Sequence, residues 1–162
     1  MSRLARSRPN NTWDFLYSTV SGVLTYLASI GSSSNNVSIV LLGTINANVA
    51  GQTIVVKPQG SGSLTNNGSI NVTTGTLGLL PDTTGTLTNT GTISVSGGSI
   101  TLGGAFTKAG LGTFNRTGGA VYLSGVLDNT SKTLAFDASS GSWNLYGGTV
   151  KGGTITQSGG AK

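Results

Sequence analysis

A repeat within the sequence sets the strongest limit on the fold. The segment 62–72 matches the segment 85–95 at seven of eleven positions, with an offset of 23 residues. Self-similarity at a fixed period of this length is typical of solenoids, in which each repeat forms one coil and stacks on the next. The repeat therefore predicts that successive coils bury a shared core between them.

Extending the register gives three columns of apolar residues, each recurring every 19–23 residues. Because alternate residues of a strand point to opposite faces, the columns are expected inside and the residues between them outside. Three columns predict three strands per coil. The first holds Leu64, Leu87, Phe106, Leu127 and Val150; the second Ile70, Val72, Ile93, Val95, Phe114, Leu134, Phe136 and Ile155; the third Leu77, Leu79, Ile100, Leu102, Val121, Leu123, Trp143 and Leu145.

The predicted fold class is all-β, a parallel β-solenoid over residues 38–162. A further step back of 23 residues places five more apolar residues inside a first coil: Leu41, Ala47, Val49, Ile54 and Val56. After the second strand of the sixth coil the chain reaches residue 162, so we expect a C-terminal edge without a cap of its own.

Two signals concern the corners between strands. Asn66 and Asn89 occupy equivalent corners, where asparagine tolerates the left-handed conformation and can stack with its counterpart in a ladder. The dipeptide 67–68 is Asn-Gly, which is instead a turn signal for an antiparallel hairpin. A hairpin fold does not need the three-column register, so we prefer the solenoid.

Composition excludes several classes of site. Gly, Ser, Thr and Asn make up more than half of the 162 residues, which is typical of disordered chains, but the regular spacing of the apolar residues favours strands separated by turns. The absence of Cys and His excludes disulfides, thiol catalysis and the usual zinc sites. We expect no cofactor, no metal and no small-molecule substrate.

The few acidic residues give little support to catalysis. Solenoid enzymes that cleave polysaccharides use paired carboxylates or metal-binding acids. Asp128 and Asp137 fall in one coil, about one corner apart, and no third acid or nearby base accompanies them. We therefore expect a protein that is not an enzyme.

Two kinds of outward residue suggest binding functions. Tyr122 and Tyr146, near Trp143, are possible glycan contacts, which keeps a carbohydrate-binding module as a minor alternative. A second minor alternative is ice binding, because hydroxyl side chains precede the inward residues of the second column. That row is only one residue wide: Ser69, Thr92, Thr113, Thr133 and Thr154.

The N-terminus differs from the rest of the chain. Residues 1–12 form a basic arm, whose three arginines are too few to favour nucleic acid as a partner. Residues 13–37 form an attachment or cap segment with an apolar stripe at spacings of 3 and 4 residues over 13–30, which favours a helix, although its Ser, Thr, Gly and Val leave an extended strand open. We expect attachment through Arg3, Arg6, Arg8, Trp13, Leu16, Val20, Val23, Leu27 and Ile30.

The run 85–104 resembles the passenger repeats of bacterial autotransporter and haemagglutinin-type adhesins, and similar repeats occur in phage fibres and tailspikes. The resemblance covers residues 38–156, is compositional, and implies an extended rod with an adhesive surface. It carries over no catalytic or binding residue, because the matching positions belong to the core or to corners.

These observations together predict a structural or adhesive rod. The stretch after the basic start is not a convincing secretory signal, because Asp14 and several hydroxyl residues interrupt it. We therefore expect a virion location, as a phage appendage attached through its N-terminus, with a secreted or surface bacterial adhesin as the alternative. The expected partners are further copies of the chain, a trimer being one arrangement, a docking structural protein, and a cell-surface glycan.

Overall fold

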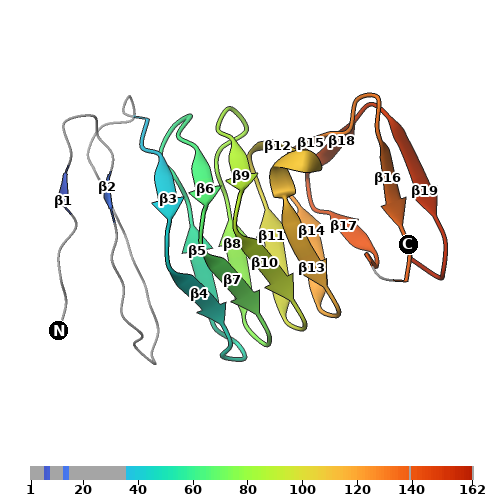
Figure 1. Ribbon diagram of the computed structural model, residues 1–162, viewed down its shortest axis with the longest axis horizontal. Helices are drawn as coiled ribbons and strands as arrows, with labels where there is room; N and C mark the ends of the chain where they lie inside the picture. The colour runs from blue at the N-terminus through green and yellow to red at the C-terminus, as the bar shows by residue number, and fades with distance from the viewer. Residues whose placement is uncertain (1–5, 8–12, 15–35, 139, 162) are drawn as a thin grey trace.

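The computed structural model describes residues 6–7, 13–14, 36–138 and 140–161, and these form a stack of short strands along one long axis (Figure 1). Five coils of three strands run from β3 to β17, and β18 and β19 begin a sixth. Within the described residues the only helical element is the 3-10 turn η1 (Ala109–Leu111), and none of their helices is long and apolar enough to cross a membrane.

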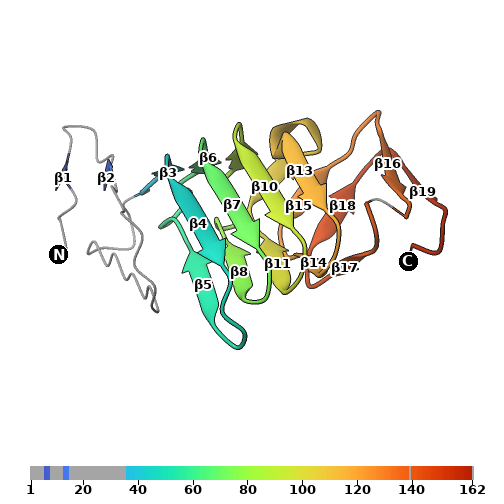
Figure 2. The ribbon, with the colours of Figure 1, turned by 60° about the horizontal axis from the view of Figure 1, so that its bottom comes forward.

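By their order in the coil the strands fall into three stacks that run along the long axis (Figures 1 and 2). The first stack contains β3 (Ile39–Leu41), β6 (Leu64–Asn66), β9 (Leu87–Asn89), β12 (Ala105–Thr107), β15 (Val126–Asp128) and β18 (Thr149–Lys151). The second contains β4 (Thr44–Ala47), β7 (Ser69–Val72), β10 (Thr92–Val95), β13 (Thr113–Arg116), β16 (Thr133–Phe136) and β19 (Thr154–Gln157). The third contains β5 (Thr53–Val56), β8 (Thr76–Leu79), β11 (Ser99–Leu102), β14 (Ala120–Leu123) and β17 (Trp143–Leu145).

The predicted all-β parallel solenoid is confirmed, because every strand ladder between successive coils of the described residues is parallel. Leu64 pairs with Leu87, and Phe106 pairs with Leu127, which pairs with Val150. Leu64 and Leu127 are completely buried and Leu87 is 1% exposed. The first column of inward residues is therefore the stack that the spacing predicted.

The register of the first coil differs from the prediction in two stacks. Ile45 pairs with Ile70, an offset of 25 residues where 23 were expected, and Val49 is 54% exposed in a corner turn instead of lying inside. The reason is a longer corner: residues 48–52 separate β4 from β5, whereas residues 73–75 suffice in the next coil. The shift is even, so the inward and outward faces of the strands are preserved.

An asparagine ladder links the corners of the first stack, as the sequence predicted. The buried Asn66 donates through Nδ2 to Oδ1 of the buried Asn89 at 2.7 Å. Asn89 donates in turn to the carbonyl oxygens of Leu111 at 2.8 Å and Thr113 at 3.1 Å. The ladder thus satisfies backbone carbonyls that the change of direction at each corner leaves without strand partners.

The second stack breaks after its fourth strand, and Arg116 lies at the break. β13 pairs with β10, whereas β16 pairs only with β19. Arg116 occupies the register position of the buried Val95, and its Nη2 donates to the carbonyl oxygen of Gly119 at 2.6 Å. Gly141, at φ 62°, lies so close over the guanidinium that a Cβ there would meet Nη1 at 1.5 Å. The strand pattern did not predict this inward arginine.

The N-terminal strands extend the first stack. β1 (Arg6–Ser7) pairs antiparallel with β2 (Trp13–Asp14), and β2 is parallel to β3 through the pair Trp13 and Ile39. Trp13 is thus in a strand, which differs at this residue from the helix expected over 13–30. The rest of that expected helix, and the attachment residues other than Arg6 and Trp13, lie outside the described residues.

Candidate functional site

The two carboxylates considered for catalysis each close a local turn. Oδ1 of Asp128, at the end of β15, accepts a hydrogen bond from the backbone N–H of Thr130 at 2.9 Å. Oδ1 of Asp137 accepts bonds from the backbone N–H and the hydroxyl of Ser140 at 2.8 and 3.1 Å. Both arrangements are typical of aspartate at turns, where the side chain bonds the backbone two or three residues on.

Hydrogen bonds from the side chain and backbone of Thr130 hold the pKa of Asp128 below its ordinary value, and Lys151 on the neighbouring strand adds to this effect. A lowered pKa means that the ionised carboxylate stabilises the fold above the pKa of the unfolded chain. This contribution is lost as the pH falls through the lower pKa of the folded state. A general acid needs a raised pKa, so the shift has the wrong direction for that role.

We predict that the double substitution Asp128→Asn and Asp137→Asn leaves function and fold unchanged. Asparagine keeps the Oδ1 acceptor that closes each turn, so the variant is expected to fold, with a slightly lower melting temperature at neutral pH because the charge of Asp128 is lost. Reducing-end assays on a panel of polysaccharides are expected to show no cleavage by either protein. A cleaving activity that is present in the wild type and lost in the double variant would contradict this prediction.

Among the described residues, no group of three or more His, Cys, Asp or Glu side chains could hold a metal ion. The hydroxyl row is divided by the break in the second stack. Ser69, Thr92 and Thr113 lie in register on β7, β10 and β13, whereas Thr133 and Thr154 pair with each other on a separate sheet. A regular hydroxyl surface along the whole rod is therefore interrupted.

The third stack carries the most distinctive surface among the described residues. Val121 and Leu123 of β14 are completely buried, so Tyr122 between them faces outward. Tyr146 follows β17 and is 71% exposed; its ring lies edge-to-face on that of Tyr122, with centroids 6.0 Å apart and planes at 72°. The two tyrosines proposed from sequence as glycan contacts are thus brought together.

Polar side chains flank this pair in register. Tyr122 has Thr101 of β11 opposite it on one side and Asn144 of β17 on the other. Tyr146 is held by its backbone N–H, which donates to the carbonyl oxygen of Leu123 at 2.8 Å. We call the surface formed by these side chains the tyrosine face: Thr101, Tyr122, Asn144 and Tyr146.

Trp143 belongs to the interior, as the column pattern predicted. Its ring centroid lies 5.7 Å from that of Phe114 and 6.0 Å from that of Phe136, in tilted contacts. The tryptophan is therefore part of an aromatic cluster in the last coils and does not join the tyrosine face.

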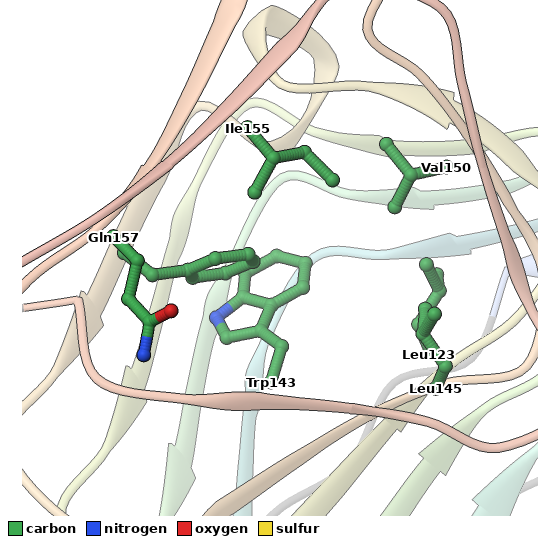
Figure 3. A pocket seen from close by; sticks show the side chains of 7 residues that line it. Leu123, Trp143, Leu145, Val150, Ile155 and Gln157 are labelled. Atoms are coloured by element: carbon green, nitrogen blue, oxygen red, sulfur yellow. The ribbon is translucent and has the colours of Figure 1, made fainter. Parts of the chain in front are cut away.

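The C-terminal end of the rod contains an apolar hollow of about 180 Å³. Figure 3 shows Trp143 beside Gln157 and below Ile155, with Leu145 on the opposite wall. The inward residues Leu145 and Ile155 are 65% and 55% exposed, because β17 and β19 are the last strands of their sheets. The hollow is the open interior of the last coil.

Comparison of the chain with models of protein families, with curated proteins and with solved structures gave no match.

Proposed function

We propose that this protein is a non-enzymatic structural and adhesive rod, an appendage of a phage virion that is attached through its N-terminal segment. The observation that carries the proposal is the placement of the N-terminal strands: β1 and β2 continue the first stack at one end of the long axis, beyond β3 (Figure 1). A segment at the end of a rod can dock while the coils project.

Three further features support this function. The strands are held by a repeated core and an asparagine ladder, and neighbouring coils of a solenoid stabilise each other, which suits an extended rod. The carboxylates of Asp128 and Asp137 each close a local turn, which explains their presence without a catalytic role. The compositional resemblance to fibre, tailspike and adhesin repeats points to the same class of proteins.

We predict that deletion of residues 1–30 releases the rod from its attachment. Six large apolar side chains recur on the stripe over 13–30, and burying each one stabilises an assembly by about 1.5–3 kcal/mol. Full-length protein is expected to co-sediment with particles in a density gradient, and the truncated protein is expected to remain soluble or to aggregate. A variant with Arg3, Arg6 and Arg8 replaced by Ala separates the contribution of the basic arm from that of the stripe.

A truncated protein that still co-sediments with particles would refute the attachment proposal. Full-length protein found on the bacterial surface, with no particle fraction, would refute the virion location and favour the secreted adhesin. Intact coils in the truncated protein, verified by its circular dichroism spectrum, exclude misfolding as the cause of release.

A further inference from the structure

We infer that the tyrosine face is a contact site for a neutral glycan, an inference that rests on the proposed adhesive function. The face belongs to a rigid scaffold, because its strands β11, β14 and β17 are paired in parallel and their inward residues Ile100, Val121 and Leu123 are completely buried. A surface on paired strands holds its contacts more precisely than one on a loop.

The aromatic rings provide an apolar contact that remains open. Tyr146 keeps 71% of its surface exposed although its ring touches that of Tyr122. Within the described part of the chain, neither phenol hydroxyl has a hydrogen-bond partner. Sugar rings present C–H groups on one face and hydroxyls at the rim, which matches an exposed aromatic ring with a free hydroxyl.

The polar neighbours continue this contact along the rod. Asn144 donates one long bond, at 3.4 Å, from Nδ2 to the carbonyl oxygen of Val121, and among the described residues no donor bonds its amide oxygen. Thr101 lies on the other side of Tyr122, and strands in a sheet are about 4.8 Å apart. That spacing is close to the length of one pyranose unit, so successive sugars of an extended chain can meet successive strands.

The lack of charged side chains on the strands of the third stack indicates which class of glycan fits. No residue of β5, β8, β11, β14 or β17 is charged. The guanidinium of Arg116 is turned to the carbonyl oxygen of Gly119, in the interior register of the second stack. Acidic polysaccharides and nucleic acids are recognised through basic side chains, so a neutral glycan fits this face better.

The test is isothermal titration calorimetry of the full-length chain with cello-, malto- and mannohexaose, and with a galacturonic acid hexamer as the charged probe. We expect at least one neutral hexasaccharide to bind. Tyr146→Ala is expected to weaken that binding about tenfold, whereas Tyr146→Phe keeps the ring and stays within about twofold. Val55→Ala is the matched control, because Val55 is 50% exposed on β5 of the same stack, at the other end of the rod.

Lack of binding by all three neutral probes, equal binding by Tyr146→Ala, or tighter binding of the acidic hexamer would each overturn the inference. Because Tyr146 is exposed, Tyr146→Ala is expected to have the melting temperature of the wild type. A measured melting temperature that agrees excludes misfolding as the cause of weaker glycan binding. Binding by the chain that lacks residues 1–30 is expected to be unchanged. Failure of the glycan site is thereby distinguishable from failure of the attachment proposal.

Discussion

Leu87→Asp is expected to unfold several coils of the rod. Leu87 is 1% exposed and stacks on Leu64 inside the solenoid. The substitution removes about 1.5–3 kcal/mol of apolar burial and places a carboxylate in the core at a further cost of several kcal/mol. The free energy of unfolding of a typical domain is about 5–15 kcal/mol, so little of it would remain. Circular dichroism and amide hydrogen exchange measure the loss of folded coils.

Thr88→Asp is the matched control, because Thr88 is the next residue on the same strand and faces outward opposite Thr65. It is expected to lower the free energy of unfolding by less than about 1 kcal/mol. In Leu87→Asp, protection of backbone amides from hydrogen exchange should be lost in the coils that neighbour β9 as well as in β9 itself, since each coil depends on its neighbours. A cooperative melt of Leu87→Asp at the wild-type temperature would contradict the assignment of the core.

Asn89→Ala is expected to lower the free energy of unfolding by about 3 kcal/mol. The substitution removes the acceptor for Asn66 and the donor to the carbonyl oxygens of Leu111 and Thr113. Buried polar groups without partners each cost about 1–3 kcal/mol, and a cavity adds to this sum. Chemical denaturation followed by tyrosine and tryptophan fluorescence gives the difference in the free energy of unfolding between the variant and the wild type.

Asn115→Ala provides the comparison for this loss, because Asn115 is exposed on the outer face of β13. Its expected effect is within about 0.5 kcal/mol. Asn89→Leu separates shape from hydrogen bonding, since leucine is close to asparagine in size and lacks both the acceptor oxygen and the amide donor. Equal stability of Asn89→Ala and Asn115→Ala would show that the ladder does not stabilise the rod.

Much of the core follows from local patterns that repeat. The pairs Leu64–Leu87 and Ile70–Ile93 were predictable, because an offset of 23 residues places chemically equivalent side chains on successive strands. The bond between Asn66 and Asn89 followed from the same offset. This register stacks similar apolar side chains on each other and buries them together. Periodicity alone therefore predicts the paired residues where successive coils have the same length.

Corner lengths were decided by the tertiary structure. The longer turn over 48–52 moves Val49 to the surface. The repeat spacing was taken from the later coils, so it did not reveal that the first coil has a longer corner. The break after β13 likewise places Arg116 where the alternation of apolar residues predicts none. Both features depend on how a corner packs on its neighbour, which the spacing of apolar residues does not encode.

The tyrosine face shows the same division between local and tertiary information. Sequence alone identified Tyr122 and Tyr146 as outward aromatic residues, because they alternate with apolar positions of the third column. The edge-to-face contact and the positions of Thr101 and Asn144 beside Tyr122 required the actual register between β11, β14 and β17. Periodicity therefore determined which side chains face outward on this solenoid, and the pairing of its strands decided which of them meet, because contacts across coils depend on the length of every corner between them.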